Sequence, residues 1–179
     1  MTISVSNPHD AGAQVILRPV RSEDVALITN SWLTSYRDSC HVWGVPDRSY
    51  YWCEHKILEK LIPRSAVVVA CLEEDPNVIL GWAAYEIAEG GVMVIHYMYV
   101  KKPFRGLKIA TKLFQEVWKI EQEPGVVIFT ARTKHSWGIY NDKLKDMNRP
   151  LWVYNPYLRY DEFNTWSLDV DLLRKVEDE

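Results

Sequence analysis

The 179-residue chain has no long apolar run. None approaches the roughly 20 consecutive apolar residues that a membrane-spanning helix requires. Its beginning, MTISVSNPHDAGAQ, lacks the basic start and the apolar stretch of a signal peptide. We therefore expect a protein of the cytoplasm that has no contact with membranes.

Cysteine is scarce. The chain has three, and Cys40, Cys53 and Cys71 do not show the paired spacing of a metal site. An odd number of widely spaced cysteines favours reduced thiols over a disulfide framework. We expect neither disulfides nor a bound metal.

Neither sign of charge is in large excess, since the net charge is −3. This balance gives no general attraction to nucleic acid or to an anionic membrane. Residues 131–160 differ, because basic side chains alternate there with aromatic ones, a composition that suits an acidic or aromatic partner. A solvated face backed by aromatic core residues is the other interpretation. The six basic residues of this segment are Arg132, Lys134, Lys143, Lys145, Arg149 and Arg159.

Internal repeats and low-complexity segments are absent. The length and the 47% hydrophobic content suit one compact domain and are too small for two. Residues 1–14 are polar and contain proline and glycine without periodicity, so we expect a flexible leader there. Residues 15–179 are expected to form the single domain.

The first half of the domain contains one strand and two helices by pattern. The segment VILRPV at 15–20 predicts a strand, and Ser22 with Asp24 predicts the capped start of an apolar-periodic helix. Residues 37–52, RDSCHVWGVPDRSYYW, have the composition of a loop with unusually large rings. A second helix is expected from about residue 51 to 61, ending before Pro63.

The second half begins with three apolar segments, 66–72, 78–88 and 92–100, separated by turn residues. This pattern predicts an antiparallel meander. An amphipathic helix of about four turns follows from Leu107, then a strand at 126–130 and a helix at 136–147. Because a helix joins the strands 92–100 and 126–130, they should be parallel. The end of the chain indicates irregular structure, LWVYNPYLRY, and a closing strand or hairpin at NTWSLDV.

The junction YMYVKKPFRGLKIAT, at 97–111, joins a predicted strand to a predicted helix through one glycine. A helix N-terminus offers free backbone N–H groups and a partial positive charge, which together bind phosphate. Gly106 permits close approach of a ligand to the backbone, and Arg105 adds a forked cation. Lys101, Lys102 and Lys108 add further charge, although such lysines could equally solvate a turn.

The order of these elements, together with VKKPFRGLKIATKLF, resembles the GCN5-related N-acetyltransferase (GNAT) superfamily over about residues 15–145. The family signature is an Arg or Gln, two variable residues, Gly, one residue, then Gly or Ala. This chain carries Arg105, Gly106, Leu107, Lys108, Ile109 and Ala110 at these positions. The resemblance implies an α/β (α+β) fold with a mixed, mostly antiparallel sheet of six to seven strands and about four helices.

The resemblance also implies acetyl-CoA as co-substrate. Its pyrophosphate would be held by backbone N–H groups at Arg105, Gly106, Lys108 and Ala110, within a cofactor-binding segment that includes Leu107 and Thr111. The strand residues Met98, Tyr99 and Val100 would pair with the pantetheine. Lys108 departs from the signature glycine. If it lies in the first helical turn its φ is negative and its N–H remains available, whereas a positive φ would cost about 1 to 2 kcal/mol.

Three residues are candidates for catalysis. Strand alternation places His96 on the same face as Met98 and Val100. The ordinary histidine pKa of about 6.5 suits a base that accepts the proton of the amine. In aralkylamine acetyltransferases of this superfamily, histidines on this strand are implicated as bases. Glu86 is a second candidate base, acting through water, and Tyr140 is the candidate proton donor to the departing thiolate. Packing or solvent exposure is the alternative for each of the three.

The sequence thus predicts an N-acetyltransferase that transfers an acetyl group from acetyl-CoA to an amine of a small molecule or protein. The aromatic segments 41–52 and 152–160 are expected to form the acceptor pocket. A catalytically degenerate CoA-binding module, and a GNAT-type enzyme acting on nucleic acid, are the alternatives. A homodimer is compatible with the sequence, which does not determine the oligomeric state.

Overall fold

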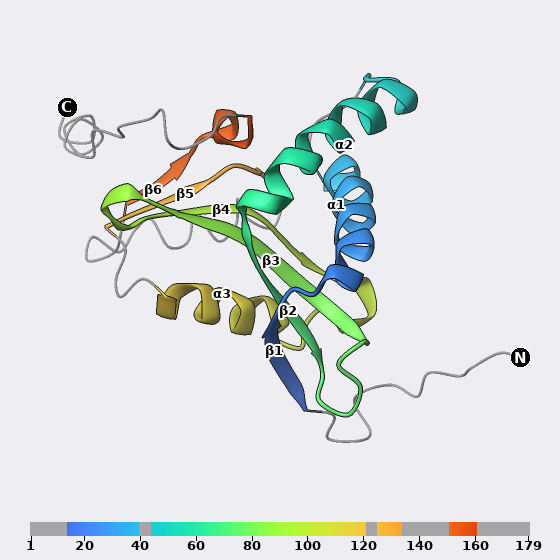
Figure 1. Cartoon of the computed structure of the whole chain (residues 1–179), viewed down its shortest axis with the longest axis vertical. Helices are drawn as coiled ribbons and strands as arrows, with labels where there is room; N and C mark the ends of the chain where they lie inside the picture. The colour runs from blue at the N-terminus through green and yellow to red at the C-terminus, as the bar shows by residue number, and fades with distance from the viewer. Residues whose placement is uncertain (1–13, 40–43, 121–124, 134–150, 161–179) are drawn as a thin grey trace, which may run out of the picture.

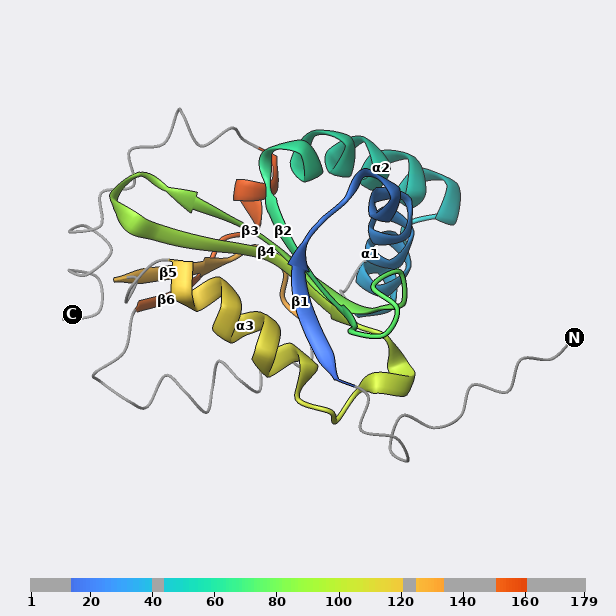
Figure 2. The same ribbon diagram turned by 60° about the horizontal axis from the view of Figure 1, so that its bottom comes forward.

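A computed structural model describes residues 14–39, 44–120, 125–133 and 151–160 of the chain. Six strands form one sheet in the order β1-β2-β3-β4-β5-β6. Helices α1 and α2 lie on one face of this sheet and α3 lies on the other (Figure 1). Turning the molecule shows α3 running along the sheet below β3 and β4 (Figure 2). The predicted class is confirmed: a mixed, mostly antiparallel sheet, with six strands and three α-helices in the described parts of the chain.

The described chain passes through the elements in a simple order. The strands are β1 (Val15–Pro19), β2 (Ala66–Leu72), β3 (Ile79–Ala88), β4 (Val92–Val100), β5 (Val126–Phe129) and β6 (Leu151–Tyr154). The helices are α1 (Val25–Ser39), α2 (Asp47–Arg64) and α3 (Ile109–Ile120). Short 3-10 turns lie at Ser22–Asp24 (η1), Glu89–Gly91 (η2), Lys102–Phe104 (η3) and Pro156–Arg159 (η4).

Strand pairing changes from antiparallel to parallel at β4. β1 to β4 pair antiparallel with their neighbours, as the meander predicted. β4 and β5 are parallel, as expected for two strands joined by a helix. The segment LWVY, predicted to be irregular, is instead strand β6 and pairs parallel with β5. Its backbone partners come from 25 residues earlier, since Leu151 pairs with Val126, so its local sequence gave no sign of them.

One half of the core lies between the sheet and the helices α1 and α2. Trp32 of α1, Trp82 of β3 and Tyr97 of β4 pack together, with ring centroids 5.1 to 5.8 Å apart. The two tryptophans are fully buried. Burying rings of this size contributes a large share of the hydrophobic stabilisation of the domain.

The other half of the core lies under α3. Ile109, Leu113 and Val117 recur every four residues and are no more than 1% exposed. They pack against the other face of the sheet, including Val68 and Leu80. The predicted amphipathic helix is therefore present, but it begins at Ile109, after Leu107. Ala110, the second residue of α3, is exposed.

Helix α2 is longer than predicted at both ends. It begins at Asp47, directly after Pro46, and includes residues that the sequence suggested were loop. Proline before the first turn leaves no helical bond unmade, and an acidic residue there complements the helix dipole. Pro63 lies inside the last turn, where its missing N–H removes only one bond.

The predicted cap before α1 is present in altered form. Residues Ser22–Asp24 form a 3-10 turn, and the Asp24 carboxylate accepts the backbone N–H of Arg21 (2.8 Å) and the guanidinium of Arg18 (2.6 Å). The Arg18 hydrogen bond, more than any other interaction, lowers the pKa of Asp24 below its ordinary value. Asp24 thus fixes the passage from β1 into α1.

Several predictions lie outside the described residues: the leader at 1–13, the helix at 136–147 with Tyr140, and the closing segment NTWSLDV. In the described part of the chain, no helix has both the length and the apolar character needed to cross a membrane.

Candidate active site

Strands β4 and β5 separate halfway along β4. Their described pairing ends at Ile95 with Phe129, followed by one more bond from Thr130 N–H to the Ile95 carbonyl (3.1 Å). β4 continues to Val100, still paired with β3 on its other side. The edge of β4 beyond the bulge therefore faces an opening between the two strands. An open strand edge presents backbone donors and acceptors to a ligand.

A β-bulge at His96 accompanies this separation. Tyr97 pairs with Ala84, whereas Ile95 pairs with Tyr85, so His96 is the additional residue of β4. Strict alternation, which placed His96 on the face of Met98 and Val100, is therefore wrong. Ile95 packs on the α3 side with those two residues, whereas the His96 side chain bonds Glu86.

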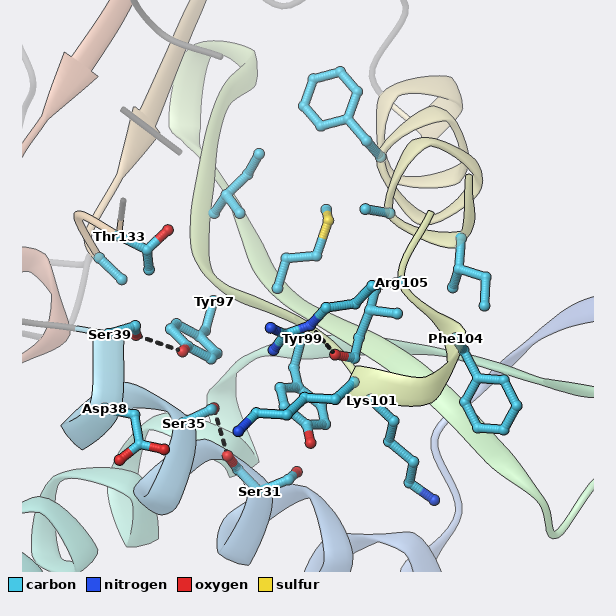
Figure 3. Close-up of a pocket in the computed structure, with 18 of the residues that line it drawn as sticks. Ser31, Ser35, Asp38, Ser39, Tyr97, Tyr99, Lys101, Phe104, Arg105 and Thr133 are labelled. Carbon is cyan, nitrogen blue, oxygen red and sulfur yellow. Dashed lines mark hydrogen bonds between the residues drawn. The ribbon is translucent and has the colours of Figure 1, made fainter. Parts of the chain in front are cut away.

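The opening is a pocket of about 1150 Å³ (Figure 3). The residues on one side come from α1, and those at its base come from β4. The β4–α3 junction and the first turns of α3, as far as Phe114, close one end. Phe129, Ala131, Thr133 and Trp152 complete the lining. Pockets of this size accommodate a cofactor-sized ligand.

The β4–α3 junction has an unusual backbone. Gly106 has φ +87° and Lys108 has φ +58°, both in the left-handed region. The expectation of a negative φ at Lys108 is wrong, because Lys108 precedes the first helical residue and its carbonyl accepts the N–H of Lys112 (3.0 Å). Turns of this kind direct backbone N–H groups toward one side and form anion-binding concavities.

Seven of the nine predicted cofactor-binding residues line the pocket, whereas Leu107 and Thr111 do not. The seven are Met98, Tyr99, Val100, Arg105, Gly106, Lys108 and Ala110. Arg105 is oriented by a hydrogen bond from its Nε to the Val100 carbonyl (3.1 Å). Burial lowers the pKa of Lys101, which also lines the pocket. Four cations, Lys101, Lys102, Arg105 and Lys108, thus gather at this end.

The two described candidate bases, His96 and Glu86, contact each other. His96 Nε2 lies 2.8 Å from Glu86 Oε1, and the same oxygen lies 2.9 Å from Arg64 Nε. His96 Nδ1 lies 3.3 Å from Thr130 Oγ1. Burial is the main cause that lowers the pKa of His96, although the Glu86 hydrogen bond opposes it.

These contacts determine which protons the cluster can hold. A carboxylate only accepts hydrogen bonds, so Nε2 carries the proton of a neutral His96 and Nδ1 keeps the lone pair. The Thr130 hydroxyl beside Nδ1 donates its hydrogen to the His96 carbonyl (3.2 Å). His96 adjoins the pocket but is fully buried, so its ring has no surface exposed to solvent. Glu86 is not among the pocket-lining residues.

The acceptor side differs from expectation. None of the residues 44–52, predicted to form part of the acceptor pocket, lines it; Tyr50 is buried against α1 and Trp52 is 66% exposed. Of the second predicted aromatic segment, Trp152 lines the pocket. The opposite wall comes from α1, which sequence reasoning missed. Its polar stripe, Ser31, Thr34, Ser35 and Asp38, has helical spacing, which by itself is indistinguishable from a solvated face.

The two described basic residues of the segment 131–160 differ in exposure, since Arg132 is exposed and Arg159 is buried. Arg159 is buried and paired with Glu54 of α2, and its guanidinium lies 4.3 Å from the centre of the Tyr36 ring. Four others of the six basic residues, and Tyr140, lie outside the described residues.

Comparison with solved structures supports this fold. A putative acetyltransferase from Pyrococcus furiosus is 16% identical with a TM-score of 0.58, covering 80% of this chain and 99% of its own. The PaiA N-acetyltransferase from Thermoplasma acidophilum, solved with coenzyme A, is 14% identical with a TM-score of 0.56 (72% and 87%). A GNAT family acetyltransferase from Brucella melitensis, solved with acetyl-CoA, is 18% identical with a TM-score of 0.51 (71% and 82%).

Among curated proteins, none matches this chain. The model of the acetyltransferase (GNAT) family matches residues 28–143, which is more than half of the chain. The match begins within α1 and includes β4, β5 and the β4–α3 junction. The chain therefore belongs to the GNAT acetyltransferase family.

Proposed function

We propose that the protein is an acetyl-CoA-dependent N-acetyltransferase acting on an amine of a small molecule or protein. One observation carries the proposal: β4 extends past its pairing with β5 and lines a pocket that ends at the glycine-containing turn before α3. A free strand edge and a helix N-terminus are the two surfaces that an extended, phosphate-bearing thioester needs.

The described residues suit the pantetheine and the pyrophosphate of acetyl-CoA. The open edge of β4 at Met98–Val100 would pair with the amides of the pantetheine. The backbone N–H groups after Gly106, at the start of the 12-residue helix α3, would receive the pyrophosphate. Lys101, Lys102, Arg105 and Lys108 add positive charge at this end, which favours the anionic donor.

The reaction requires two proton movements. The amine nitrogen attacks the thioester carbonyl, the C–N bond forms, and the C–S bond breaks to release CoA as a thiolate. His96 is the proposed acceptor of the amine proton, since burial keeps its ring neutral, with Glu86 holding the tautomer. Because His96 is buried, it acts through an intervening group, not by direct contact. Tyr140 is the proposed proton donor to the thiolate.

The donor part of the proposal is tested by thermal unfolding with acetyl-CoA, CoA or NADPH. A ligand at 100 times its Kd adds about 2.7 kcal/mol of stability, so the first two should raise the Tm by several degrees. NADPH, which also carries an adenine nucleotide but no pantetheine, is the matched control. An equal shift with all three, or no shift with CoA, contradicts the proposal.

The catalytic part competes with a CoA-binding module that does not transfer acetyl groups. The occupation of both His96 ring nitrogens favours that alternative. His96→Gln and Tyr140→Phe should each lower the rate of CoA release with an amine by about 10² or more, while CoA still stabilises the protein. His55→Gln and Tyr157→Phe change exposed residues outside the pocket and serve as controls. Transfer that survives both site substitutions refutes these two roles.

A further inference from the structure

The α1 wall of the pocket is a surface of hydrogen-bond acceptors. Thr34 Oγ1 donates to the Asn30 carbonyl (2.9 Å), and Ser31 Oγ donates to the Ile28 carbonyl (3.1 Å). Ser35 Oγ donates to the Ser31 carbonyl, as Figure 3 shows. A hydroxyl has one hydrogen, so the oxygens of Thr34 and Ser35 have only lone pairs left for a ligand. Ser31 Oγ also accepts the indole N–H of Trp82 (2.9 Å) and keeps one lone pair. This wall therefore suits a ligand that brings its own N–H donors.

Asp38 adds a negative charge to the same wall. It is exposed, and it is the one carboxylate among the described residues that line the pocket. The pocket's cations, Lys101, Lys102, Arg105 and Lys108, belong to the β4–α3 junction. The described pocket thus takes its cations from the β4–α3 junction, and its carboxylate and hydroxyl acceptors from α1.

An acceptor that exploits this wall needs more than its reacting nitrogen. That nitrogen must lose its proton to attack the thioester, so it gives up its charge at the reaction centre. A carboxylate on the α1 wall forms its strongest hydrogen bond with a nitrogen that stays protonated. Ser31 and Asp38 are seven residues apart, which spans about 10 Å along a helix and leaves room for two nitrogens separated by a short aliphatic chain.

We propose that the acceptor is an aliphatic amine with a second, permanently cationic nitrogen, a diamine or longer polyamine, which Asp38 and the α1 hydroxyls bind. This inference rests on the proposed acetyl transfer, and it names the substrate class. Asp38 fixes the distal ammonium, and the near nitrogen reaches the open edge of β4. The rings of Tyr97 and Tyr99, which also line the pocket, add apolar and cation–π contacts for such a chain.

The test measures binding of three probes to the CoA-saturated full chain by titration calorimetry. 1,4-Diaminobutane carries the second cation, 4-amino-1-butanol replaces it with a hydroxyl, and 4-aminobutanoate replaces it with an anion. We expect the diamine to bind at least about fivefold more tightly than the amino alcohol, with a preference that declines as salt is added. Asp38→Asn should remove this preference. Glu74→Gln, which removes an exposed charge from the β2–β3 turn, should retain it.

Each outcome decides the inference. Equal binding of diamine and amino alcohol, tighter binding of the aminobutanoate, binding by none of the three, or a preference that survives in Asp38→Asn overturns it. These results concern the acceptor alone, because CoA stabilisation and CoA release from acetyl-CoA with any amine test the transferase proposal separately. The kcat/KM of the diamine can also be compared with that of the amino alcohol, in the wild type and in Asp38→Asn. If Asp38→Asn lowers this ratio mainly by raising the KM of the diamine, Asp38 binds the distal cation and does not act in the chemical step.

Discussion

Lys108 adopts a backbone conformation that lysine disfavours. Its φ of +58° brings Cβ close to the following carbonyl, which costs about 1 to 2 kcal/mol in a residue other than glycine. The GNAT signature has glycine at this position, and the structure supplies the physical reason. Lysine in place of glycine therefore lowers the free energy of unfolding at the residue that precedes α3.

Lys108→Gly should stabilise the protein by about 1 kcal/mol, because glycine adopts this φ without the Cβ clash. Urea unfolding of the apo protein measures the change. Lys108→Ala, which removes the side chain but keeps Cβ, should remain near wild type. Lys112→Gly, at an exposed position inside α3, should destabilise by about 1 kcal/mol. A destabilised Lys108→Gly variant would show that the side chain contributes more than the strain costs.

His96 makes the stability of the folded state depend on pH. Burial lowers its pKa below the ordinary 6.5, so the unfolded chain takes up a proton that the folded state resists. Its contribution to stability is therefore complete above pH 6.5 and is lost as the pH falls from there toward the folded-state pKa. Acid therefore destabilises the folded state through His96.

The free energy of unfolding should fall between pH 7.5 and 5.5 by less in His96→Gln than in the wild type. The difference is at most about 1.4 kcal/mol, because only the one pH unit below the unfolded-state pKa of about 6.5 contributes over this range. Urea denaturation at the two pH values gives the difference. His55→Gln, at an exposed position on α2, should keep the wild-type difference. An unchanged pH dependence in His96→Gln would mean that His96 is protonated equally in both states.

At the scale of elements, buried ionic groups hold η4 against α2. Arg159 pairs with Glu54, and both are at most 6% exposed. Arg64, at the end of α2, donates to the Leu158 carbonyl (2.6 Å) and pairs with Glu86 of β3. The segment that follows β6 is thus fixed to α2. The same helix contacts Glu86, the partner of His96, through Arg64.

Arg159→Met should destabilise the protein by about 3 to 5 kcal/mol, because it leaves the Glu54 carboxylate buried without its partner. Replacing both residues, Arg159→Met with Glu54→Leu, should recover most of this loss, since the apolar pair needs no desolvation of charge. Urea unfolding of the three variants measures the coupling. A double variant as unstable as Arg159→Met would show that the cost comes from lost packing against Tyr36.

Elements with a strong local pattern were predictable from sequence. The strands β2 to β4 are short apolar segments bounded by turns, and α3 carries a four-residue apolar repeat. Two elements were not. The first turn of α2 was hidden by the aromatic residues around Tyr50, and β6 forms only because its backbone pairs with β5, far away in the chain. Pairing between distant segments leaves little trace in either segment alone.

At the scale of the whole molecule, the site exists because two faces of the sheet meet at one opening. α1 approaches from one face and the N-terminus of α3 from the other, and β4 separates from β5 between them (Figure 2). The proposed donor and acceptor sites therefore share one pocket. This arrangement suits direct transfer within a ternary complex.

The sequence by itself determined the class of fold, the β4–α3 junction and the segment proposed to bind the donor, because these depend on local periodicity and on a short contiguous motif. Only the tertiary structure decided that His96 lies in a bulge against Glu86, that Lys108 has positive φ, and that α1 lines one side of the pocket. Each of these depends on strand register or on contacts between residues far apart in the chain, which local patterns do not encode.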